Sequence, residues 1–306
     1  MVEYLKLLLF LNNLKDLIML KNLATRMTRI GTFPLDTLIP LATKHGYDSI
    51  EFPLFEIKTV DEAKDAALKV RNSGLEWGLM PMDIDIMREC PDDEFESDFL
   101  LLNQQMALAE AAGVKRYYNH VWPGSNERSF NENFEWCVKR FGRVYKSAKE
   151  HGLQSGLEFI GPKTLQDAFK YPFIRNLKNI LTLADAISSE VGVLVDTYHW
   201  YTSGSTLEDL DLLQSGKRVV GVHLNDGWKE RTRDEQQDME REMPLATGVI
   251  DAVSVIKKLD EMGFNGPVTV EPFEPAATRL QAMPLDDACK EVVDSLNKVF
   301  NLAQIQ

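Results

Sequence analysis

Eight alternations between a short apolar run and a longer segment with helical spacing constrain the fold of this chain more than any other feature. Parallel strands need a long crossover connection, and that connection is usually a helix. Such alternation therefore predicts a parallel sheet, and eight strand–helix pairs predict its closure into a single-domain (β/α)8 TIM barrel of the α/β class. The expected strands are Leu23–Thr28, Tyr47–Phe52, Leu75–Met82, Val114–His120, Leu153–Phe159, Val191–Asp196, Lys217–Leu224 and Pro267–Pro272.

Glycines at the ends of the helix-like segments agree with this alternation. Gly46, Gly113 and Gly263 each follow such a segment, where glycine accepts the left-handed conformation that ends many helices. An open doubly wound sheet is the alternative fold, but it would need a glycine-rich phosphate loop, and neither GxGxxG nor GxxxxGKS/T occurs. The expected helices are Pro34–His45, Val60–Asn72, Glu94–Ala112, Asn131–His151, Arg175–Ser188, Leu207–Gln214, Ala252–Met262 and Asp286–Val299.

The chain of 306 residues suits one barrel domain, expected over residues 22–306 and preceded by an N-terminal extension, residues 1–21. Leucine dominates this extension, but Lys6 and Lys15 interrupt it, and no apolar stretch approaches the ~20 residues that span a bilayer. Glu3 and the lack of a small-residue cleavage pattern argue against a signal peptide. We expect an amphipathic helix that packs on the barrel or on a second subunit of a homo-oligomer.

The formal net charge of −13 argues against nucleic acid and anionic membranes as partners, because like charges repel. The expected partner is a small molecule instead. Cys90, Cys137 and Cys289 are widely spaced and form no CxxC motif, so they indicate free thiols in a reducing cytoplasm.

Four successive expected strands, the fifth to the eighth, end in a residue that can bind a metal ion. In a barrel these ends are neighbours at the C-terminal mouth, where TIM barrels carry their chemistry. Each residue alone is explained as well by a helix cap or a rim charge. Together, three carboxylates and an imidazole favour one divalent cation, such as Mn²⁺, Co²⁺, Zn²⁺ or Mg²⁺. This strand-end quartet comprises Glu158, Asp196, His223 and Glu271.

Four further residues are expected near the same mouth. His199 follows Asp196 in the loop, where it could hydrogen-bond a substrate hydroxyl or simply pack. Arg241 lies in the charged loop after the seventh strand and could hold a substrate oxygen or form part of a solvated lid. Trp122 could line the pocket wall or pack elsewhere, and Glu51, at the end of the second strand, could contact substrate or support the metal ligands.

These residues, in this order, resemble the xylose isomerase-like barrel family of sugar isomerases and epimerases, which also contains inosose dehydratase and endonuclease IV. Within it, LEFIG and DTYH look most like inosose isomerase-type proteins. The resemblance implies that the quartet binds the metal and that His199 and Arg241 contact substrate. The stretches that carry it lie within His45–Phe273: HGYDSIEF, AAGVKRYY, LEFIGP, VGVLVDTYHWYTSG, VVGVHLND, the run from Arg241 to Asp251, and VTVEPF.

Two departures from the family pattern bear on the substrate. The family loop usually reads P-G-x-G before I-D, whereas Pro244 is followed here by Leu-Ala-Thr-Gly. Ketose 3-epimerases carry a second glutamate shortly after the metal-binding one, and Gly161–Thr164 offers none. The missing glutamate argues against a ketose 3-epimerase specifically.

The expected activity is metal-dependent isomerisation or epimerisation of a sugar or an inosose by proton transfer through an enediolate. Glu158 and Glu271 would act as base and acid, and Asp196 and His223 would only bind the metal. A dehydratase acting on an inosose or a dehydroshikimate would use the same site, and a barrel that only binds a ligand is a third hypothesis. No basic phosphate site is evident near the mouth, so we expect an unphosphorylated substrate.

Overall fold

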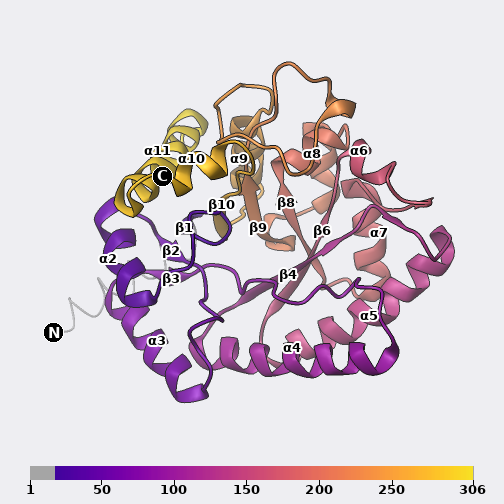
Figure 1. The fold of residues 1–306 in the computed structure, drawn as a ribbon, viewed down its shortest axis with the longest axis horizontal. Helices are drawn as coiled ribbons and strands as arrows, with labels where there is room; N and C mark the ends of the chain where they lie inside the picture. The colour runs from indigo at the N-terminus through magenta and orange to yellow at the C-terminus, as the bar shows by residue number, and fades with distance from the viewer. Residues whose placement is uncertain (1–17, 306) are drawn as a thin grey trace.

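The computed structural model describes residues 18–305 and confirms the TIM barrel, with eight parallel strands (Figure 1). Neighbouring strands pair in the order β3-β2-β1-β10-β9-β8-β6-β4. A parallel bridge between Met80, just after β3, and Tyr117 of β4 joins the two ends of this order and closes the ring. The strands are β1 (Leu20–Leu23), β2 (Ser49–Ile50), β3 (Glu76–Trp77), β4 (Arg116–Val121), β6 (Gln154–Phe159), β8 (Gly192–Asp196), β9 (Val219–Leu224) and β10 (Pro267–Val270).

Helices surround the strands and cover the outside of the barrel (Figure 1). Because the strands are covered on both faces, they read as apolar runs, and every residue of β8 is buried. The long helices are α2 (Leu35–His45), α3 (Val60–Asn72), α4 (Asp92–Ala112), α5 (Phe130–Glu150), α7 (Leu177–Ile187), α9 (Ala252–Glu261) and α11 (Leu285–Ala303). The short ones are α6 (Lys163–Gln166), α8 (Thr197–Thr202), α10 (Ala276–Gln281) and three 3-10 turns, η1 (Leu207–Leu213), η2 (Gly216–Arg218) and η3 (Arg233–Glu235).

Local capping explains where the outer helices begin and end. Thr59 starts α3 with a capping box, in which its hydroxyl accepts from the backbone of Glu62 and the Glu62 carboxylate accepts from the backbone of Thr59. At their C-terminal ends, α2 and α4 stop at Gly46 and Gly113, whose φ angles are 74° and 80°. These left-handed glycines confirm the helix ends expected from the sequence.

The first strand lies three residues earlier than the sequence predicts. Of the expected strand Leu23–Thr28, only Leu23 belongs to β1. The backbone N–H and the hydroxyl of Thr28 both donate to the carbonyl of Ala24, at 2.9 and 3.1 Å, and so close a turn. Residues 24–30 are therefore a loop at the barrel mouth instead of a strand.

The N-terminal extension lies mostly outside the described residues, which exclude 1–17. Its last residues, Leu20 and Lys21, pair with β10 as part of β1. None of the helices within residues 18–305 is long and apolar enough to cross a membrane.

Several small elements were not expected from the sequence, and two of them lie near the barrel mouth. The residues after Asp196 form a helix, α8, and not a loop, because the Asp196 carboxylate caps the helix start. A two-stranded antiparallel ribbon, β5 (Gly124–Ser125) with β7 (Tyr171–Pro172), links the loops that follow β4 and β6. Both elements lie where they can shape the mouth of the barrel.

Candidate active site

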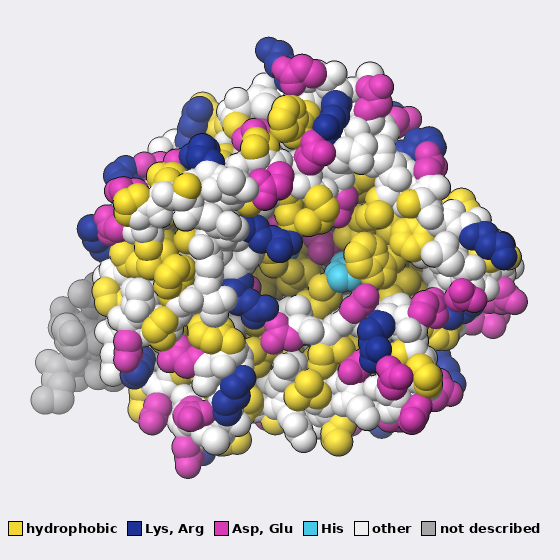
Figure 2. Space-filling view, viewed as in Figure 1, with side chains coloured by type: hydrophobic (Ala, Val, Ile, Leu, Met, Phe, Trp, Pro, Cys, Tyr) yellow, Lys and Arg dark blue, Asp and Glu magenta, His cyan; other side chains and the backbone are white. Residues whose placement is uncertain are grey.

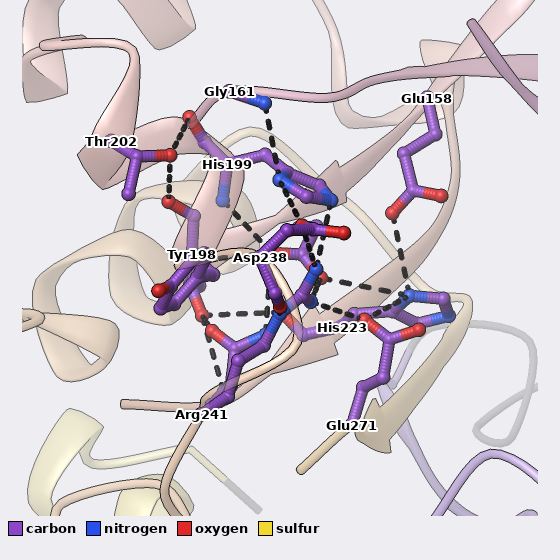
Figure 3. A network of polar contacts seen from close by, with 12 residues as sticks. Glu158, Gly161, Tyr198, His199, Thr202, His223, Asp238, Arg241 and Glu271 are labelled. Carbon is purple, nitrogen blue, oxygen red and sulfur yellow. Dashed lines mark hydrogen bonds and ion pairs between the residues drawn. The ribbon is translucent and has the colours of Figure 1, made fainter. Parts of the chain in front are cut away.

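The strand-end quartet gathers at one point of the barrel mouth (Figure 3). Glu158 lies near the end of β6, and Asp196 is the last residue of β8. His223 lies near the end of β9, and Glu271 directly follows β10. These strands are consecutive in the ring, and Asp196 and His223 are paired in register. One ligand atom from each of the four residues lies within 4.8 Å of the others.

The central nitrogen of this group is Nδ1 of His223. It lies 3.5 Å from Glu158 Oε1, 3.5 Å from Glu271 Oε2 and 3.8 Å from Asp196 Oδ2. Among residues 18–305, neither ring nitrogen of His223 has a hydrogen-bond partner, and Glu158 Oε1 has none either. Buried polar atoms are seldom left unpartnered, because the cost is a kilocalorie per mole or more. Three carboxylate oxygens and one imidazole nitrogen around one point fit a divalent cation.

Arg241 supplies positive charge to the quartet. Its Nη1 donates to Asp196 Oδ2 at 2.9 Å and to Glu271 Oε2 at 2.6 Å, and the side chain is only 2% exposed. Its Nη2 donates to Asp238 Oδ1 at 2.8 Å. Arg241 is therefore part of the buried charge network and not of a solvated lid.

The pKa values of the quartet reflect this mutual neutralisation. Burial alone would lower the pKa of His223, but the carboxylates of Glu271 and Glu158 raise it well above its ordinary value. Burial alone would raise the pKa of Asp196, but the charge of Arg241 holds it below its ordinary value. The proton on His223 thus carries the positive charge that a metal ion would supply.

Two neighbours fix the orientation of Asp196. Its Oδ1 accepts from the backbone N–H groups of Tyr198 and His199 at 2.7 and 3.0 Å, as the cap of α8. The amide of Asn225 donates to both carboxylate oxygens, at 3.2 and 3.1 Å. Partners of this kind hold a metal ligand in its binding orientation.

His199 is a buried residue of α8, which corrects its expected place in a loop. Its Nδ1 accepts from the backbone N–H of Gly161 at 3.1 Å (Figure 3). Burial lowers the pKa of His199, which favours the neutral ring. A neutral ring that accepts at Nδ1 carries its proton on Nε2, the nitrogen that lies 3.2 Å from Nη2 of Arg241. Both groups are donors, so this corner of the site suits an oxygen atom that accepts from both of them.

A cavity of about 530 Å³ opens above the quartet. Figure 2 shows it as a hollow with a histidine and acidic side chains inside it. Glu158 and Glu271 line the cavity and are 5% and 8% exposed, whereas Asp196 and His223 lie beneath it at 1% and 0%. The four other residues singled out from the sequence, Glu51, Trp122, His199 and Arg241, also line it.

Sequence reasoning missed an Asp–His pair at the same mouth. His120 lines the cavity, and its Nε2 lies 3.7 Å from Asp85 Oδ1. Asp85 also accepts from the indole N–H of Trp122 at 3.1 Å, and the two rings of His120 and Trp122 meet edge to face at 4.6 Å. Trp122 is thus a fixed wall of the cavity. Asp85 follows β3 in an irregular loop, so no strand pattern marked it.

One carboxylate organises the long loop that carries Arg241. Asp226 accepts five backbone N–H groups, and its own backbone exchanges two hydrogen bonds with Glu242 at 2.9 Å. This loop contains the departure from the family pattern, and Leu245 there has a left-handed φ of 63°. The five donors are the backbones of Gly227, Thr247, Gly248, Val249 and Ile250.

Comparison with known sequences gives one family. The family described as xylose isomerase-like TIM barrel matches residues 39–299. An inosose isomerase from Bacillus licheniformis is 28% identical over 270 residues, which cover 85% of this chain and 91% of that protein. The inosose isomerase of Bacillus subtilis is 30% identical over 162 residues, and that match spans only 51% of this chain and 53% of the relative.

Solved structures have the same fold. A xylose isomerase domain protein from Alicyclobacillus acidocaldarius superposes with a TM-score of 0.74 at 25% identity, covering 90% of this chain and 97% of that one. The IOLI protein, solved with a zinc atom, gives a TM-score of 0.70 at 19% identity, covering 93% and 97%. At 19% identity, the similarity to the IOLI protein shows a shared fold and nothing more.

We predict that Gly161→Ala will destabilise the protein and disturb His199. A Cβ at Gly161 would lie 2.2 Å from the carbonyl oxygen of His199 and 2.5 Å from Thr202 Oγ1, so α8 would have to move. We expect a loss of roughly 1–3 kcal/mol in the free energy of unfolding, measured with urea. Gly142→Ala in α5 is the control, because its Cβ would meet nothing within 4 Å; equal stability of the two variants would contradict the prediction.

We also predict a pH-dependent effect of Glu51→Gln. Burial raises the pKa of Glu51 to about 7, so the folded protein binds a proton that the unfolded chain has released. Ionisation of Glu51 therefore lowers stability as the pH rises from about 4.5 to 7. Glutamine removes this penalty, so Glu51→Gln should be near neutral at pH ~5 and stabilise by roughly 1–3 kcal/mol at pH ~8.

Urea unfolding of Glu51→Gln at both pH values, with a chelator present, checks this expectation. Glu76→Gln on β3 is the matched control, because that carboxylate is exposed. The same stability change at both pH values would show that Glu51 does not titrate between them and would contradict the prediction.

Proposed function

The chain belongs to the xylose isomerase-like TIM barrel family, and we propose that it is a metal-dependent isomerase or epimerase of a sugar or cyclitol ketone. The names of its relatives support this activity, since four of them are inosose isomerases. The barrel mouth supports it independently, because it brings metal-type ligands, two accessible carboxylates and hydroxyl-binding donors into one cavity.

The quartet would hold one divalent ion, of which Mn²⁺, Co²⁺, Zn²⁺ and Mg²⁺ all accept such donors. The unpartnered Nδ1 of His223 and Oε1 of Glu158 fit this role. When bound, the ion acts as a Lewis acid that makes the hydrogen next to a ketone more acidic. Asp196 and His223, which lie below the cavity floor, would serve as ligands only.

Glu158 and Glu271 would move the proton. Both line the cavity, and they approach it from β6 and β10, with β8 and β9 between them. Burial raises the pKa of Glu271 despite the opposing charges of His223 and Arg241, which makes it a better proton acceptor than an exposed carboxylate. One glutamate would remove the α-proton to give an enediolate, and the other would return a proton to the neighbouring carbon or to the opposite face.

The remaining residues of the cavity would orient the substrate. The Nε2–H of His199 and the guanidinium of Arg241 are donors for hydroxyl or carbonyl oxygens. Trp122 presents an aromatic wall, and Glu51 offers a carboxyl group to a hydroxyl. The observation that carries the proposal is a difference in access to the cavity. Glu158 and Glu271 line the cavity, whereas Asp196 and His223 do not.

Isotope exchange tests this assignment. We expect the metal-replete protein to exchange the α-proton of a ketose or an inosose with solvent deuterium, measured by NMR. Glu271→Gln should lower the exchange rate by roughly a hundred-fold or more, because glutamine accepts no proton. Glu274→Gln is the control, since that carboxylate is exposed three residues further on.

Exchange at the wild-type rate in Glu271→Gln would refute the role of Glu271. Product analysis of the same reactions separates an isomerase from a dehydratase, which expels a β-hydroxyl after the same proton abstraction. An enone that absorbs ultraviolet light would identify the dehydratase reaction.

A further inference from the structure

Two arginines from the loop after β1 line the rim of the cavity. Arg26 and Arg29 were not singled out from the sequence: Arg26 fell inside the expected strand Leu23–Thr28, and Arg29 directly followed it. Figure 2 shows basic side chains along one side of the hollow. No basic phosphate site was expected near the mouth, and these two arginines place basic residues there in addition to Arg241.

The two arginines differ in their partners. Arg26 Nη2 donates to Asp83 Oδ1 at 3.0 Å, so part of its charge is already neutralised. The guanidinium of Arg29 has no carboxylate or hydrogen-bond partner within residues 18–305. In a chain with a net charge of −13, an exposed cation at the mouth of an acidic cavity is available for an anionic ligand.

The conformation of Arg29 directs it towards the cavity. Its φ is 60°, a left-handed value that a non-glycine residue adopts at a cost, and such strain is often found at ligand sites. Its Cζ lies 4.6 Å from the centre of the Phe273 ring, a cation–π contact that holds the flat guanidinium against the wall. The loop is fixed from outside, since the carbonyl of Arg29 accepts from the amide of Gln281 at 2.7 Å.

Phe273 connects this arginine to the metal centre. The ring lies two residues after Glu271, and Cζ of Arg241 is 4.5 Å from the same ring centre. Arg241 is occupied by three carboxylates, those of Asp196, Asp238 and Glu271. Of the two guanidinium groups on Phe273, Arg29 is therefore the one that can take an anion from the substrate.

We propose that the substrate carries an anionic group, a carboxylate or a phosphate, which Arg29 binds with help from Arg26 at the rim while the ketone lies over the quartet. Only the position of the ketone in this proposal rests on the proposed function. A cavity of about 530 Å³ accommodates a six-carbon polyol with such a group. A guanidinium recognises both anions through paired N–H donors.

Calorimetry on the Mn²⁺-replete full-length protein tests the proposal with three polyols of one carbon skeleton: glucitol, glucitol 6-phosphate and gluconate. We expect at least one of the two anions to bind roughly ten- to hundred-fold more tightly than neutral glucitol, because a charge-assisted pair adds to its affinity. The preferred anion tells a phosphate ester from a carboxylate.

Arg29→Gln should weaken binding of the preferred anion to the level of glucitol, and Arg29→Lys should retain part of the preference. Arg71→Gln, which changes an exposed arginine at the end of α3, should bind like the wild type. Equal binding of the three polyols, no binding of either anion, or a preference that persists in Arg29→Gln would overturn the proposal. The last result would assign the anion to another cation, either Arg26 or the metal ion.

This binding measurement does not need turnover. If no ketone exchanges deuterium but Arg29→Gln still removes the preference for an anion, only the proposed reaction fails. If exchange occurs but the anion preference is absent, only the role of Arg29 fails.

Discussion

The repulsion between three carboxylates buried side by side at the barrel mouth is the constraint on which the rest of the site depends. Unpaired charges are unstable in a low-dielectric interior, so the fold must supply compensating cations. Arg241 pairs with two of the carboxylates, and the imidazole of His223 faces all three. A divalent ion at the same point would leave each buried ligand atom with a partner.

The barrel makes this arrangement possible because four adjacent strands end at the same level. Around it, two charged groups have a second restraint: Asp196 caps α8 and accepts from Asn225, and Asp226 ties down the loop that carries Arg241. These restraints leave Glu158 and Glu271 as the two carboxylates that reach the cavity. The carboxylates of the site thus differ in their roles. Asp196 faces only the cation position, whereas Glu158 and Glu271 also face the substrate cavity.

The sequence allowed the eight strands and the quartet to be predicted because buried parallel strands read as apolar runs, and a polar residue at the end of a run stands out. Arg29 and the pairing of His120 with Asp85 could not be predicted in the same way. The leucines before Leu23 were assigned to the extension, so residues 24–28 of the loop that carries Arg29 were taken for a strand. The partner of His120, Asp85, lies 35 residues away in an irregular loop, where only tertiary structure brings the two together.

Metal content is the measurement that tests the central role of the quartet most directly. The wild-type protein is stripped with a chelator, reconstituted separately with Mn²⁺, Co²⁺, Zn²⁺ or Mg²⁺, and analysed by elemental mass spectrometry. We predict one ion per chain for at least one metal, and binding weaker by roughly ten-fold or more in a His223→Leu variant that keeps the wild-type circular dichroism spectrum. Less than a tenth of an ion per chain in the reconstituted wild type, or full binding in the folded variant, would contradict a metal site built on these four residues.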